Sequence, residues 1–161
     1  MEKLGVKDFG QSLTPLISNI WTIRGPRWRR LGAMSTPITE LLAFTIDSAD
    51  ASALARFYGD LTGGEVADYP EYGIASATVL GSTVNFQTVA DYARPAWPGQ
   101  EHPQQFHLDF RVDDLEAATA HAEALGATRA GFQPAEELGG SWRVMIDPDG
   151  HPFCLCPPGQ D

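Results

Sequence analysis

Residues 105–116 decide the fold, and they read Gln-Phe-His-Leu-Asp-Phe-Arg-Val-Asp-Asp-Leu-Glu. Polar and apolar side chains alternate over 105–112, which is the pattern of a half-buried β-strand. Asp113 is followed three residues later by Glu116, and this capping-box pattern predicts the start of a helix. Apolar residues then recur at helical spacing until Gly126, which ends the helix. These residues are Leu115, Ala118, Ala122 and Leu125.

The same order of elements occurs earlier in the chain. Residues 40–47 alternate as a strand, and residues 48–61 have the apolar spacing of a helix. Ser48 or Asp50 is the expected N-cap of this helix, and Gly63 ends it. Short runs between turn residues predict further strands after each helix. They lie at 65–67, 74–80, 83–89, 128–130, 141–146 and 152–156.

The two halves can be aligned by counting along the chain. Phe44 then corresponds to Phe110, and Gly81 corresponds to Gly150 at nearly the same separation. The sequence therefore predicts an α+β fold of two tandem βαβββ modules, at about 38–90 and 104–157. In each module one face of the sheet is covered by the helix, so the other face must meet the second module or a ligand.

Charge divides the chain near residue 36. Residues 1–36 contain six basic and two acidic side chains, and residues 37–161 contain five basic and nineteen acidic ones. The net charges are therefore +4 and −14, within a total of −10. This break predicts a basic extension at 1–36 before a domain at 37–161. Three interpretations stay open for the extension: true initiation at Met34, a disordered tail, or an ordered arm on a partner subunit.

Composition excludes several classes of protein. The strongly acidic domain argues against nucleic acids and anionic membranes as partners, and no apolar run approaches the length of a membrane span. Cys154 and Cys156 are two apart on a predicted strand, with Cα atoms about 6.5–7 Å apart, at or beyond the limit for a disulfide. We therefore expect two free thiols and a reducing, cytoplasmic location.

Two motifs carry a resemblance to a known family. The stretch from His107 to Glu116 and the stretch Asp147-Pro-Asp-Gly-His-Pro-Phe at 147–153 resemble the vicinal oxygen chelate superfamily, and within it the glyoxalase-like domain branch. The resemblance covers residues 38–157. It implies the glyoxalase/bleomycin-resistance/dioxygenase fold, in which two modules form a cupped mixed sheet with a small molecule in the cup. It also implies a homodimer.

The resemblance also allows a test for a metal. Metal-dependent members hold a divalent ion with four cup residues, typically two histidines and two glutamates. Carried over by register, those positions are Leu41, Asn85, His107 and Cys154, and only His107 has the expected type. A residual site from His107, Cys154 and Asp109 has too few suitable ligands. We therefore expect no metal and no other cofactor.

Strand alternation sorts the candidate site residues between the helix side and the cup. His107 and Asp109 share the cup face of one strand, so Asp109 can orient His107 as a general base. These two residues are the catalytic candidates. The ligand-binding candidates are Asn85, Gln87, Gln105, Arg143, Cys154 and Trp97. Trp142, Val144 and Ile146 are expected on the helix side, with Arg143 and Met145 in the cup.

Each of these assignments has a structural alternative. His107 can be a strand histidine that only hydrogen-bonds Asp109 or Gln105, and Arg143 can pair with nearby acids. Cys154 can be a small buried residue rather than a nucleophile. Trp97 can anchor the proline-rich connection at 91–103 rather than line a pocket.

Three hypotheses about function follow. The first is a metal-independent isomerase or lyase that acts on a small oxygenated or aromatic molecule through His107. The alternative is a non-catalytic protein of bleomycin-resistance type that sequesters an antibiotic or metabolite. A third is an interaction module without a small ligand. Glyoxalase I activity is not expected, because that chemistry uses the metal.

Overall fold

The computed structural model describes residues 40–159, which belong to one compact unit. The first module contains β1 (Phe44–Ser48), α2 (Ala51–Thr62), β2 (Val66–Tyr69), the short helix η1 (Pro70–Tyr72), β3 (Ile74–Val79) and β4 (Ser82–Thr88). The second contains β5 (Leu108–Arg111), α3 (Leu115–Ala124), β6 (Thr128–Arg129), α4 (Pro134–Leu138), β7 (Arg143–Ile146) and β8 (Pro152–Cys156). The extension predicted at 1–36 lies outside the described residues.

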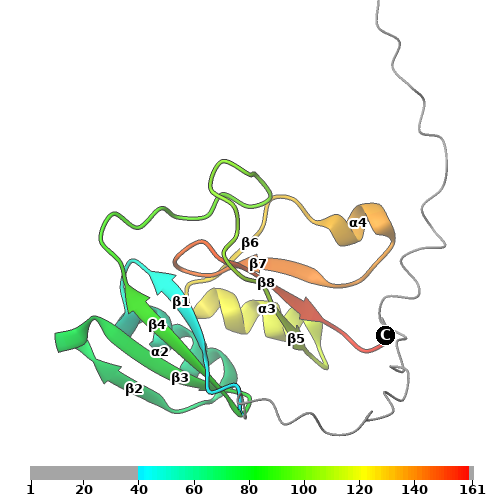
Figure 1. Ribbon diagram of the computed structural model, residues 1–161. Helices are drawn as coiled ribbons and strands as arrows, with labels where there is room; N and C mark the ends of the chain where they lie inside the picture. The colour runs from blue at the N-terminus through cyan, green and yellow to red at the C-terminus, as the bar shows by residue number, and fades with distance from the viewer. Residues whose placement is uncertain (1–39, 160–161) are drawn as a thin grey trace, which may run out of the picture. The chain divides into compact units, whose positions relative to one another are not determined.

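Each module forms its own four-stranded sheet (Figure 1). The first sheet has the order β1-β4-β3-β2 and the second has the order β5-β8-β7-β6. In both, the first and last strands of the module pair in parallel and the remaining neighbours are antiparallel. A parallel pair needs a long crossover, which α2 and α3 begin. The predicted α+β fold of two βαβββ modules is therefore confirmed, with η1 and α4 as additions.

Both long helices begin at an aspartate. The Asp50 side chain accepts a hydrogen bond from the backbone N–H of Ala53, which caps α2 as one of the two expected residues. The cap of α3 is Asp114 rather than Asp113, because the Asp114 carboxylate accepts from the N–H groups of Glu116 and Ala117. Within residues 40–159, no helix has the length and apolar character needed to cross a membrane.

The register of the sheets corrects the alignment of the first strands of the two modules. Phe44 pairs with Val84 in the first sheet, and Leu108 pairs with Phe153 in the second. Because Val84 and Phe153 are equivalent in the repeat, Phe44 is equivalent to Leu108 rather than to Phe110. Alternation repeats at every second position, and it therefore cannot distinguish registers that differ by two.

The helix-side faces of both sheets share one hydrophobic core. Tyr58 on α2 stacks on Phe86 of β4, with ring centroids 5.6 Å apart, and also contacts the ring of Phe153 on β8 at 6.4 Å. Phe57 lies edge-on to Phe153 at 6.1 Å. The first helix thus packs against side chains of both modules, and this fixes the second sheet on the first.

A buried polar network around Asp147 joins the modules a second time. Asp147 Oδ2 accepts from the Tyr58 hydroxyl at 3.0 Å and contacts His151 Nδ1 at 3.0 Å. Asp147 Oδ1 accepts from the backbone N–H groups of Asp149 and His151 at 2.9 and 2.8 Å. The Ser48 hydroxyl donates to Asp149 at 2.5 Å. Burial, and then the charge of Asp147, hold the pKa of Tyr58 well above its usual value, so its hydroxyl stays a donor.

Candidate functional site

The candidate site lies on the second sheet, on the face opposite α3. His107 directly precedes β5, Asp109 lies in it, and Cys154 comes from the neighbouring parallel strand β8, where it is the register partner of Asp109. Phe153 and Leu155, the neighbours of Cys154, point to the helix side and belong to the main core. The structure thus places His107, Asp109 and Cys154 on one face, as the alternation predicts.

One nitrogen of His107 makes both contacts of the ring in this cluster. His107 Nε2 lies 3.0 Å from Cys154 Sγ and 3.5 Å from Asp109 Oδ1. A carboxylate only accepts hydrogen bonds, so the arrangement favours the tautomer that carries its proton on Nε2. Every buried side-chain nitrogen or oxygen among the described residues has a partner, and His107 Nδ1 bonds none of these residues. Nδ1 is therefore not fully buried, and in this tautomer it is the nitrogen that carries the lone pair.

The two thiols of the face have opposite pKa shifts. The hydrogen bond with Cys156 raises the pKa of Cys154, and burial adds to the rise, so this thiol is protonated at neutral pH. The same hydrogen bond lowers the pKa of Cys156. A nucleophile requires the thiolate. Cys154 is thus better suited to donate its S–H within the cluster than to attack a substrate.

Aromatic side chains cover the rest of this face. Trp97, Trp142 and Ile146 pack on a small buried cluster formed by Ala130, Val144 and Cys154. Trp97 also contacts the ring of Phe132, with centroids 5.8 Å apart. Trp97 therefore anchors the connection at 91–103 on the domain and also lies on the candidate face. The two alternatives expected for it do not exclude each other. The sequence did not predict Trp142 or Phe132 here.

Arg143 lies on the opposite face from the one expected. Its guanidinium donates to both carboxylate oxygens of Glu116 at 2.7 and 3.1 Å, and to the Thr119 hydroxyl at 2.7 Å, so it reaches α3. The hydrogen bond with Glu116 raises the pKa of Arg143, and the same contact lowers the pKa of Glu116. The expected orientation of β7 is therefore wrong, because Met145 is fully buried in the main core and Val144 lies on the candidate face.

The three polar candidates outside this cluster make no hydrogen bond to His107 among the described residues. Asn85 and Gln87 are on β4 of the first sheet, where Gln87 donates to Asp47 at 2.7 Å. Gln105 is exposed and precedes β5. Among the described residues, no hydrogen bond joins any of these three amides to His107, Asp109 or Cys154. Within the described residues, the His107 cluster therefore receives no polar side chain from the first sheet through a hydrogen bond.

The donor set does not fit the divalent ion of metal-dependent relatives. With the corrected alignment, the first-module counterpart of His107 is Ala43 rather than Leu41, and neither residue can bind a metal. Asn85 is neutral, and the Cys154 thiol is protonated. His107, Asp109 and Cys154 offer ligand atoms within 4.8 Å of one another, but a hard oxygen-and-imidazole quartet is not present among residues 40–159.

The comparisons with known proteins come from a family model and from solved structures. The model of the glyoxalase-like domain matches residues 43–156. Among curated proteins, none matches the chain. A glyoxalase/bleomycin resistance protein/dioxygenase family enzyme from Burkholderia phytofirmans PsJN superimposes with a TM-score of 0.52 and 20% identity, over 73% of this chain and 97% of that one.

Two fosfomycin resistance proteins are also similar in structure. FosX from Mesorhizobium loti has a TM-score of 0.53 and 15% identity, over 74% of this chain and 91% of its own. A FosX variant from Listeria monocytogenes, complexed with Mn(II) and 1S,2S-dihydroxypropylphosphonic acid, has a TM-score of 0.54 and 17% identity, over 74% and 90%. At these identities the likeness shows the fold alone. Because the family model spans most of the chain, the protein belongs to the glyoxalase-like domain family.

Proposed function

We propose that this protein is a metal-independent isomerase or lyase that moves a proton on a small oxygenated or aromatic molecule at the His107 face. One observation carries the proposal: Nε2 of His107 contacts Asp109 and Cys154, while Nδ1 bonds none of the described residues and is not fully buried. Nδ1 accepts a proton from an acidic C–H or O–H of the substrate, and the imidazolium that forms is stabilised by the Asp109 carboxylate. The same nitrogen returns the proton at the new position, so no proton is gained or lost.

The aromatic side chains supply binding next to this base. Cys154 contacts both His107 Nε2 and the cluster that holds Trp97 and Trp142, so these indole rings belong to the same face as the base. Flat apolar groups stack well on such rings. The face also lacks the cation expected from Arg143, which is engaged with α3.

The test detects proton transfer without knowledge of the natural substrate. Protein treated with a chelator is incubated in D₂O with 2-hydroxyacetophenone or hydroxyacetone, and the loss of the CH₂ signal is followed by NMR. Exchange above the buffer rate, unchanged by the chelator, is the expected result. Exchange that disappears on chelation contradicts the metal-independent mechanism.

A second function has its own supporting observation. The half-buried aromatic wall formed by Trp97 and Trp142 suits a protein that sequesters a drug or metabolite, as in the bleomycin-resistance type. The same incubation separates the two functions. A ligand that shifts the thermal unfolding transition, but is recovered unmodified and without deuterium, supports sequestration.

We further propose that the protein acts as a cytoplasmic homodimer. Both cysteines are free thiols, which supports the reducing location. Among residues 40–159, seven of the ten exposed large apolar residues lie between Leu41 and Ile74, so the first module carries the apolar surface that a dimer needs to overcome a charge of −10 per protomer. Light scattering is expected to give twice the chain mass, and Phe44→Asp on β1 is expected to lower it to one chain mass. A monomer across concentrations contradicts the proposal.

A further inference from the structure

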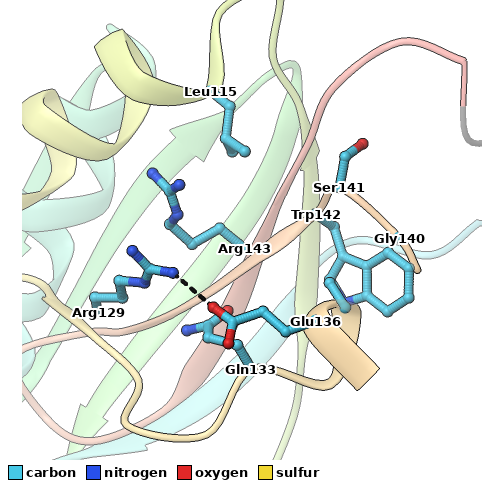
Figure 2. Close-up of a pocket in the computed structure, with 9 residues that line it drawn as sticks. Leu115, Arg129, Gln133, Glu136, Gly140, Ser141, Trp142 and Arg143 are labelled. Carbon is cyan, nitrogen blue, oxygen red and sulfur yellow. Dashed lines mark hydrogen bonds and ion pairs between the residues drawn. The ribbon is translucent and has the colours of Figure 1, made fainter. Parts of the chain in front are cut away.

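A pocket with a volume of about 250 Å³ lies at the edge of the second sheet (Figure 2). Its walls come from the start of α3, from β6, from the start of β7 and from the segment that contains α4. Neither His107 nor Asp109 belongs to its lining. The pocket therefore does not contain the proposed catalytic residues, although it shares Trp142 with the aromatic side chains of the candidate face.

The two ends of the pocket differ in chemistry. Figure 2 shows the guanidinium groups of Arg129 and Arg143 on one side and the indole ring of Trp142 on the other. A guanidinium binds carboxylates through paired N–H groups. An indole ring offers a flat apolar surface for stacking. The pocket therefore suits a molecule that is anionic at one end and aromatic at the other.

The two arginines at the cationic end can bind a ligand with little loss of protein stability. Glu116 and Thr119 engage three of the five N–H groups that the Arg143 guanidinium has. Arg129 donates one hydrogen bond to Glu136 at 3.0 Å, and the two side chains are 47% and 69% exposed. Exposed pairs of this kind contribute little stability. A ligand carboxylate can therefore replace Glu136 at Arg129 while Arg143 stays in place.

A glycine positions the aromatic end. A Cβ atom on Gly140 would overlap the ring carbons of Trp142, so only glycine lets the indole lie flat against the backbone here. The buried side chain of Gln133 bonds both the N–H and the C=O of Val144 at 2.9 Å, which holds the wall behind the ring. The ring position is thus fixed before any ligand arrives.

We propose that this pocket binds a one-ring aromatic carboxylate, with the carboxylate at Arg129 and Arg143 and the ring on Trp142. The volume of about 250 Å³ lies below the roughly 300–1,000 Å³ of pockets for drug-sized molecules, which limits the ligand to about one ring. The local charge also selects a monoanion, because the two arginines are balanced by Glu116 and Glu136 until the ligand displaces Glu136.

The experiment titrates the ¹⁵N-labelled full chain with benzoate and follows the indole N–H signals by NMR. Trp142→Phe identifies the Trp142 signal by its disappearance. We expect saturable movement of this signal with benzoate, and much weaker effects from benzamide, which lacks the charge, and from acetate, which lacks the ring. The spectrum itself reports whether each variant is folded.

A matched pair of substitutions gives opposite expectations. Arg129→Gln is expected to weaken benzoate binding at least about tenfold, because a charge-assisted contact is lost. Glu136→Gln is expected to tighten it up to about fivefold, because the competing carboxylate is removed. His107→Ala is expected to leave it unchanged, which separates this pocket from the proposed catalytic face.

Three results would overturn the assignment. They are a Trp142 signal that does not move with benzoate, equal binding of benzamide and benzoate, and equal binding by the two charge variants. The proposed function is tested by deuterium exchange rather than by this titration, so either idea can fail without the other.

Discussion

Replacing His107 with alanine is expected to lower the rate of deuterium exchange into 2-hydroxyacetophenone by about 10²–10⁴-fold, the usual contribution of a positioned general base. The substitution removes the only group that we assign to accept the proton. The side chain is 25% exposed and lies outside the main core, so the loss of activity is expected without loss of folding.

Two further measurements separate a base from a merely structural histidine. Free imidazole added to the His107→Ala variant is expected to restore part of the exchange, because it can occupy the vacated volume and accept the proton. Asp109→Asn is expected to lower the rate by a smaller factor. An asparagine amide can donate to Nε2, and this favours the tautomer in which Nδ1 carries the proton and no longer accepts one.

His102→Ala is the matched control. His102 is exposed, and its only described contact is the backbone carbonyl that accepts from the N–H of Ala96 at 2.8 Å. This variant is expected to exchange at the wild-type rate. Wild-type exchange by the His107→Ala variant would remove His107 from the mechanism and leave sequestration as the better explanation of the aromatic face.

The sequence predicted the fold well because its main signals are local. Alternation at Gln105–Val112 and the spacing of three and four along α2 depend only on which side chains are buried. The last strand, Pro152–Cys156, has the predicted bounds, since a turn precedes it and the chain leaves the sheet after it. The short helix α4 was missed because a five-residue helix spans too little sequence for a period to appear.

The candidate site was predicted less completely, and β7 shows why. The strand has the sequence Arg-Val-Met-Ile, in which both faces carry apolar residues. Val144 and Met145 are both buried, one on the candidate face and one in the main core. When both faces of a strand are covered, alternation no longer tells which face meets the helix. In β7 the pairing with β8 shows which side faces the main core. Met145 is the register partner of Phe153, and both belong to that core.

The polar residues of the first module show a second limit. A repeat assigns equivalent positions, such as Asn85 and Cys154, but equivalence within the fold does not bring two side chains together. Contact depends on how the modules pack, and here the contacts between them lie on the helix side, around Tyr58 and Phe153. Long-range packing of this kind leaves no local pattern in the sequence.

The stability of the domain is expected to depend strongly on Asp147. Its carboxylate receives the Tyr58 hydroxyl, the His151 ring and two backbone N–H groups, and Asp147 and His151 are fully buried. Asp147→Ala leaves these groups buried without an acceptor. Such losses in buried charged networks cost about 3–5 kcal/mol in the free energy of unfolding. Urea denaturation followed by circular dichroism measures the change.

Tyr58→Phe serves as an intermediate variant and Asp60→Asn as a surface control for the effect of Asp147→Ala on stability. Tyr58→Phe removes one donor and leaves three partners on Asp147, so a loss of about 1–2 kcal/mol is expected. Asp60 is exposed on α2, and Asp60→Asn is expected to stay within about 0.5 kcal/mol of wild type. If Asp147→Ala falls in the range of Asp60→Asn, the turn at 147–151 does not hold the modules together. The shared core around Phe153 then provides the whole connection, because it is the other described contact that links α2 to the second sheet.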